Sequence, residues 1–307
     1  MCMISLQIND VTDTNIFVAL NDEKKRQLTV YSNLIDNDVK ANAMVIPVPY
    51  PNTVQFHDMS SYKNFFSDCD KSFKLQSLEK DKSLLTNSFN DNKKIIGVKN
   101  IGSYKVSIAS SLNELDNIDK NVFILSNELK NILSKNYNGN VWGFIIFVLA
   151  TDKKEYHPFG WSHDLLNRQV YIPTRHYHGH QNKMSNNLQL ISEKSHKEKM
   201  TDEKLTDETM TYKKMTDEKM TNETMADETI ADDWSHKIYL YNIDNNKIEN
   251  NDFIKKVATH KYVYKWENNF EFNKSKFNNF SMNSNINFSK FDIKGLYENN
   301  DIMISVY

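Results

Sequence analysis

The chain has 307 residues, 39% of them hydrophobic and 25% charged, so it is long enough to bury a sizeable core. Its net charge of -2 leaves no basic excess to neutralise phosphates, which argues against nucleic acid as a partner. Two cysteines, Cys2 and Cys69, are too few for a disulfide framework and indicate a reducing compartment.

The apolar runs are short. The longest covers residues 141–150, which is too short to cross a bilayer and reads as a strand buried on both faces. The N-terminus lacks the basic region of a signal peptide, so we expect a soluble, cytoplasmic protein with no membrane span. Asn, Lys, Asp and Ile are abundant while Gly and Pro are scarce, a bias typical of AT-rich genomes.

Short runs rich in β-branched residues, separated by polar turns, indicate strands through most of the first half of the chain. Two prolines in residues 43–49 predict that this strand ends or lies at an edge there, because proline donates no ladder hydrogen bond. Helical spacing of Phe65, Phe66, Cys69 and Phe73 predicts a helix starting near Ser60, with Cys69 in the core. The strands expected before residue 110 are 4–8, 15–20, 27–32, 43–49, 54–56, 95–99 and 104–109.

Two helices and further strands are expected in the second half of the chain. Ser111 and Glu114 have the spacing of a capping box, and a longer helix is expected over residues 126–137, with Gly139 just beyond it. The later strands expected are 141–150, 169–173, 237–241, 257–266 and 302–307. This pattern predicts a strand-dominated α+β fold with a few helices.

A repeat with a period of five interrupts the pattern between residues 200 and 230. Five matches neither the helical period of 3.6 nor the strand period of 2, so no apolar face builds up and we expect a disordered low-complexity insert. We therefore predict one domain over residues 1–265, with a loop at 74–94 and the insert at about 182–231. Residues 266–307 are expected to form a loosely ordered tail rich in Asn, Phe and Ser.

Five of the nine histidines lie between positions 157 and 180. If residues 170–180 are extended, His176, His178 and His180 point to one face, because side chains alternate along a strand. Such a His-x-His pair is a common source of two ligands for a divalent metal such as zinc. Histidines at strand ends also serve simply as hydrogen-bonding or surface residues, and Asp164 or Glu155 nearby is either a candidate acid or base or a solvated charge.

Several segments together resemble an uncharacterised protein family of bacteria, large DNA viruses and protists. They are RQLTVYS at 26–32, NAMVIPVP at 42–49, WGF at 142–144, HPF at 157–159, IPTRHYH at 172–178 and WSHKIY at 234–239. The chain departs from the family pattern at Ser235, where the family has Asp before the histidine. The family has no assigned activity. The resemblance implies that His157, His176, His178 and His236 lie together as a metal-binding set.

Cys2 offers a separate candidate site. Removal of the initiator Met would make it an N-terminal nucleophile with its own amino group as base, although a small apolar residue at a strand start explains it equally simply. Three hypotheses stay open, and the sequence does not decide whether the protein is an enzyme. We favour a non-enzymatic binding or structural module. The alternatives are a metal-binding or metal-dependent hydrolytic protein using the four histidines, and an N-terminal-cysteine amidohydrolase.

Overall fold

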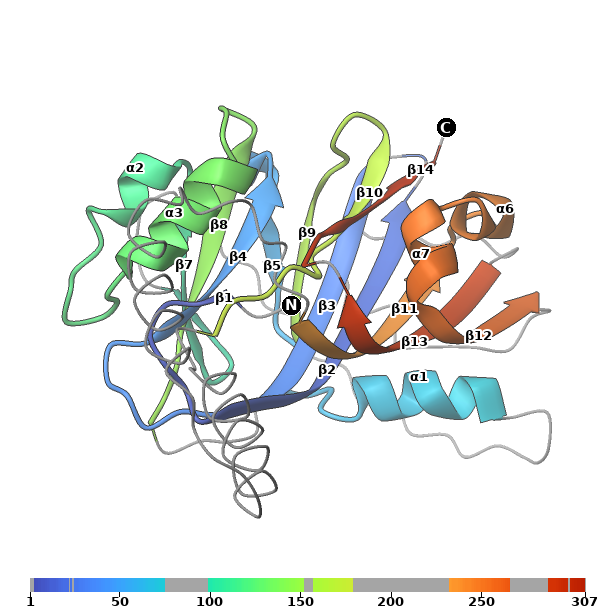
Figure 1. Ribbon diagram of the computed structural model, residues 1–307, viewed down its shortest axis with the longest axis horizontal. Coiled ribbons are helices and arrows are strands. Elements are labelled where there is room, and N and C mark those ends of the chain that lie inside the picture. Colours follow the sequence, from blue (N-terminus) through green and yellow to red (C-terminus); the bar gives the residue numbers. More distant parts are fainter. Residues whose placement is uncertain are drawn as a thin grey trace, which may run out of the picture. The chain divides into compact units, whose positions relative to one another are not determined.

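The computed structural model describes residues 3–21, 23, 25–74, 99–151, 157–178, 232–265, 287–297 and 299–306. Within them, strands in three sheets outnumber the helices (Figure 1), which confirms the prediction of a strand-dominated α+β fold. Cys2, Glu155, His180, the pentad repeat and the loop after Lys74 lie outside the described residues. No helix in the described part of the chain is long and apolar enough to cross a membrane.

The larger sheet has seven strands in the order β12-β13-β11-β2-β3-β9-β5. Neighbouring strands are antiparallel except β2 and β11, which are parallel, so β11 lies beside a strand from the start of the chain. The strands are β2 (Asp10–Asn21), β3 (Arg26–Asp36), β5 (Gln55–His57), β9 (Phe159–Asp164), β11 (Asp232–Tyr241), β12 (Ala258–Lys265) and β13 (Asn287–Tyr297).

The second sheet has five antiparallel strands in the order β1-β4-β8-β7-β6. They are β1 (Met3–Ile4), β4 (Ala43–Pro49), β6 (Lys99–Ile101), β7 (Tyr104–Ala109) and β8 (Trp142–Val148). Within the described residues β1 pairs only with Met44 and Val45, so Pro47 and Pro49 need no partner on that side of β4. This is the edge position that the prolines predict.

One face of the larger sheet is covered by helix α1 (Phe65–Lys74), seen below the sheet in Figure 1. Phe65 packs edge-to-face against Phe17 with ring centroids 5.0 Å apart, and Phe73 packs against Phe288 at 4.6 Å. Cys69, on the face of α1 that packs on the sheet, is fully buried, as its spacing predicts. These contacts form a core of their own between α1 and the sheet.

The opposite face of the same strands belongs to a larger core, because side chains alternate along a strand. Ile16 and Val18 of β2 and Ile238 and Leu240 of β11 lie on this face. The core also includes residues of β4 and β8 and of the remaining longer helices, α3 (Asn127–Asn136), α6 (Asn245–Glu249) and α7 (Asp252–Val257).

A third, two-stranded sheet and several connecting elements complete the fold. The third sheet pairs β10 (Gln169–Ile172) with β14 (Ile302–Ser305), antiparallel. Helix α3 begins where the sequence predicts, with the Ser126 hydroxyl accepting a hydrogen bond from the Leu129 amide at 3.2 Å. The shorter connections are the 3-10 turn η1 (Pro51–Thr53) and the single-turn helix α2 (Leu112–Leu115). The Glu114 carboxylate accepts from the Ser110 amide, one residue before the Ser111 cap that the sequence predicts.

Three features differ from the sequence-based expectations. Strand β9 was not predicted, because its sequence, FGWSHD, has only two large apolar residues, Phe159 and Trp161. Strand β6 occupies Lys99–Ile101, beyond the strand end expected at residue 99. Residues 287–297, within the segment expected to be loosely ordered, form β13, which pairs on both sides. Strand β14 lies within the last strand that the sequence predicts, 302–307.

Candidate histidine site

Three of the predicted histidines lie side by side. The rings of His176 and His178 have centroids 5.4 Å apart with 28° between their planes, and those of His176 and His236 are 5.7 Å apart with 32° between them. His176 and His236 are each only 7% exposed. The cluster therefore joins two segments that are nearly sixty positions apart in the sequence.

The segment that carries His176 and His178 leaves β10 and continues without regular secondary structure to Tyr177. Tyr177 forms a parallel bridge with Met3, and its carbonyl accepts a hydrogen bond from the Ile4 amide at 2.7 Å. Histidines on either side of a bridged residue project in the same direction. This is the shared face that the His-x-His spacing predicts, formed at a single bridge rather than along a strand.

His236 is placed by a regular strand. It lies in β11, opposite Thr14 of β2 on one side and Ile293 of β13 on the other. Alternation puts its side chain on the same face as Ile238 and Leu240, toward the larger core. Its backbone is fixed by two neighbouring strands.

Burial keeps His176 and His236 neutral. Loss of solvation, together with the neighbouring His178, lowers the pKa of His176 to about 3. Loss of solvation also lowers the pKa of His236 well below its usual value, and His176 and His178 add to that effect. At neutral pH each ring has one unprotonated nitrogen, the form in which imidazole binds metals, and His176 Nδ1 lies 3.4 Å from the Thr174 carbonyl.

Side chains from the end of the chain hold the backbone of residues 174–176. Asp301 Oδ1 accepts from the amides of Thr174 and Arg175, both at 2.9 Å. Asn299 Oδ1 accepts from the His176 amide at 2.7 Å, and Asn299 Nδ2 donates to the His176 carbonyl at 2.5 Å. Asp301 Oδ2 also accepts from the hydroxyls of Tyr137 and, at 3.2 Å, Tyr171. The sequence analysis does not single out these residues, which lie in an Asn-rich stretch.

His157 is placed at a different point of the second sheet. Its Nε2 accepts from the Ser103 amide at 3.1 Å, and its ring packs against Tyr104 at 4.6 Å. A Cβ added to Gly102 would lie 2.5 Å from that Nε2, so the turn between β6 and β7 needs glycine there. Because β4 and β8 lie between β1 and β7, His157 is several strands from Tyr177.

The His176 and His178 rings are stacked, and the His236 ring is tilted against that of His176. Among the described residues, no group of three or more His, Cys, Asp or Glu side chains is arranged to hold a metal ion. The terminal torsion of a histidine side chain is soft, so the rings can turn while the backbone stays fixed.

A second polar cluster was not predicted. The ring of His57 in β5 lies 3.1 Å from the Ser162 hydroxyl of β9, and Arg26 Nη1 pairs with Asp164 Oδ1 at 2.6 Å. Ser162 is buried, and Arg26 also donates to the Thr53 carbonyl at 2.8 Å. Asp164, a candidate acid or base from its sequence position, therefore serves here as an ion-pair partner that ties β3 to β9.

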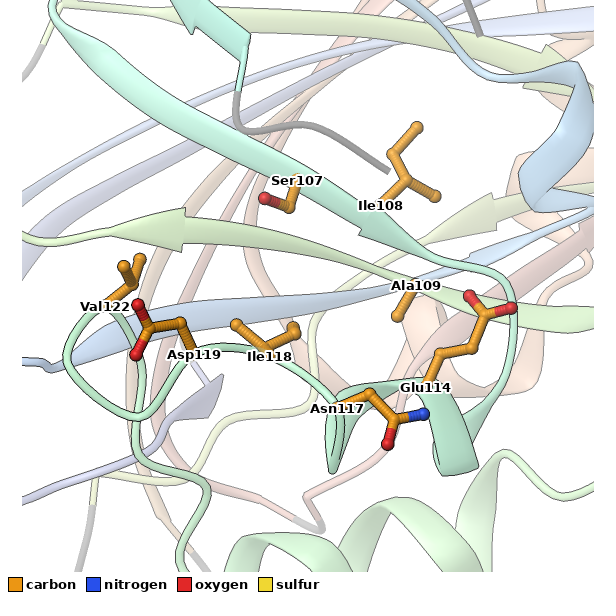
Figure 2. A pocket seen from close by; sticks show the side chains of 8 residues that line it. All are labelled: Ser107, Ile108, Ala109, Glu114, Asn117, Ile118, Asp119 and Val122. Atoms are coloured by element: carbon orange, nitrogen blue, oxygen red, sulfur yellow. The ribbon is translucent and has the colours of Figure 1, made fainter. Parts of the chain in front are cut away.

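A pocket of about 250 Å³ lies between the end of β7 and the chain after α2 (Figure 2). Figure 2 shows apolar side chains along it, with the carboxylates of Glu114 and Asp119 toward its two ends. None of the histidines lines it. The lining residues are Ser107, Ile108, Ala109, Glu114, Asn117, Ile118, Asp119 and Val122.

No protein-family model matches the chain. Among solved structures it is similar to baculovirus P35, with 12% identity and a TM-score of 0.47 over 99% of both chains. It is also similar to a mutated baculovirus P35 after caspase cleavage, with 9% identity and a TM-score of 0.44 over 97% of this chain and 99% of that one. For P35 in its complex with caspase-8 the identity is 9% and the TM-score 0.41, over 96% of both chains. Similarity of this degree establishes no shared function.

Proposed function

We propose that the chain is a non-enzymatic binding protein whose ligand is a transition-metal ion such as zinc, held by His176, His178 and His236. The observation that carries the proposal is the cluster of three imidazoles at ring separations of 5.4 and 5.7 Å. Imidazole nitrogen is a preferred zinc ligand, and three protein ligands leave a fourth position for water or another group.

The ring separations suit a shared ion. Two imidazoles bound at 2.0–2.1 Å to one tetrahedral ion have ring centres about 5 Å apart, close to the distances found here. Closing the site requires each ring to turn about its Cβ–Cγ bond, with little change in the backbone. The buried, neutral state of His176 and His236 favours binding further, because no proton has to be displaced.

Two of the residues predicted for a site stand apart from these three. His157 binds the Ser103 amide through its Nε2, so we leave it out of the ligand set. Cys2 lies outside the described residues, and its role as a nucleophile stays a prediction.

Titration calorimetry of the full-length, metal-free chain with zinc tests the proposal. We expect about one ion per chain for the wild type and no binding for the double variant H176A/H178A. H157A is the matched control and should bind as the wild type does. No binding by the wild type, or unchanged stoichiometry in H176A/H178A, would contradict the proposal.

A further inference from the structure

The segment before His178 receives its hydrogen bonds from side chains instead of a strand. Three consecutive amides, those of Thr174, Arg175 and His176, all donate to Asn299 or Asp301. Backbone amides in a folded interior need partners, and here the partners come from the other end of the chain. The position of His176 therefore depends on where that end docks.

Asn299 acts on His176 from both sides. Its amide oxygen accepts from the His176 N–H and its amide nitrogen donates to the His176 carbonyl, at 2.7 and 2.5 Å. A two-point contact of this kind fixes both the place and the tilt of one peptide unit, and with it the direction of the attached ring.

The register of the third sheet couples this contact to β14. Ile172 pairs with Ile302 at the end of the β10–β14 ladder, so residues 173–176 and 299–301 are the direct continuations of two paired strands. Thr174 Oγ1 donates to the Asn300 carbonyl at 2.8 Å, and Arg175 Nη2 donates to Asn300 Oδ1 at 2.9 Å. Undocking β14 would remove these contacts together.

We infer that Asn299 is a positioning residue for His176, and that docking of the segment 299–305 controls whether the histidine site assembles. The inference rests on the proposed metal binding and adds its regulation. Coupling between two sites is reciprocal, so a bound ion should in turn hold β14 in place. Partners that orient a ligand histidine typically contribute 10–100-fold to metal affinity.

Two Asn299 variants and a matched asparagine test the inference. N299A removes both contacts to His176, while N299D keeps an acceptor for its amide. N121A is the control, because Asn121 Nδ2 donates to Asp119 Oδ1 at 3.0 Å in the loop after α2 and not to β14. We expect zinc affinity to fall at least tenfold in N299A, less in N299D, and less than twofold in N121A. Affinity within twofold of wild type in N299A would overturn the inference.

Amide hydrogen exchange separates this inference from the proposed function. Exchange at His176 should quicken at least tenfold in metal-free N299A and remain near wild type in N121A. Zinc added to the wild type should slow exchange across β14. If the wild type binds no zinc, the proposed function fails, and the control of a metal site by β14 fails with it. Faster exchange at His176 in N299A alone would then still support its positioning by Asn299, and equal exchange in both variants would overturn that too.

Discussion

The buried histidines of this protein are held in different ways. The strand histidines are His57 and His163: the His57 ring lies against Ser162, the His163 ring nitrogen Nδ1 lies 2.9 Å from the Asp164 carbonyl, and both residues sit in paired strands. In the histidine site, His176 lies outside any strand, its backbone is bound by Asn299, and its ring contacts two other imidazoles. Both groups are buried and both contain histidines with lowered pKa values.

Burial and a lowered pKa therefore do not distinguish a structural histidine from a candidate ligand. The difference lies in which atoms are restrained. The His57 and His163 rings lie 3.1 and 2.9 Å from their partners in β9, whereas the His176 ring lies 3.4 Å from the Thr174 carbonyl and its backbone bonds to Asn299 at 2.7 and 2.5 Å. A restrained backbone with a ring torsion left soft suits a ligand, because the nitrogen can adjust while its origin stays fixed.

The largest effect is expected at Asp301, which holds the backbone of the segment that carries His176. D301A removes the acceptor of two amides and of the Tyr137 and Tyr171 hydroxyls, leaving several buried donors unpaired. We expect the free energy of unfolding to fall by roughly 4 kcal/mol in urea denaturation. D301N keeps an oxygen for the amides and should lose about 1 kcal/mol. Equal losses in the two variants would show that charge, not hydrogen bonding, is what Asp301 supplies.

A smaller effect on the free energy of unfolding is expected when acid protonates His163, one of the strand histidines. Burial lowers the pKa of His163 to about 4, and the Arg26 charge adds to this, while the unfolded chain has the ordinary value near 6.5. Above pH 6.5 neither state binds the proton. As the pH falls from 6.5 to 4 the unfolded state binds it first, so stability is lost, by up to roughly 3 kcal/mol.

The variant H163Q removes this titration. Its free energy of unfolding should therefore fall less than that of the wild type between pH 7 and pH 4.5, measured by urea denaturation at each pH. Its zinc affinity should match that of the wild type. Parallel pH profiles for the two proteins would mean that His163 is not held neutral in the folded state.

The smallest effect is expected at Ser162. S162A removes the hydroxyl beside His57 and one contact of Arg26, at 3.1 and 3.4 Å. We expect a loss of about 1 kcal/mol in thermal or urea unfolding, with zinc binding unchanged. A loss of zinc binding in S162A would contradict the distinction between the strand histidines and the histidine site.

Much of the fold is predictable from local pattern. The β-branched run with two prolines predicts β4 at its observed bounds, and Ser126 predicts the start of α3. Strand β9 escapes because only Phe159 and Trp161 in it are large and apolar, and its Gly, Ser and Asp residues are as typical of turns. The parallel pairing of β2 with β11 escapes because it joins segments far apart in the sequence, which local pattern does not encode.

The site is predictable only in part, for the same reason. The His-x-His spacing predicts that His176 and His178 share a face, and the family resemblance adds His236. His157 was grouped with them on that resemblance, yet its ring lies against the β6–β7 turn. Only the order of the strands reveals that this turn is far from Tyr177. No sequence pattern marks Asn299 or Asp301, because the chain is rich in Asn and Asp and these two residues resemble many others.

X-ray absorption at the zinc edge of the loaded protein tests the central claim most directly. If His176, His178 and His236 bind the ion, the spectrum will show zinc–nitrogen distances of about 2.0–2.1 Å with the multiple scattering of imidazole rings. That scattering should disappear in H176A/H178A and persist in H157A. A wild-type spectrum with oxygen ligands only, or one that the double variant reproduces, would contradict the account.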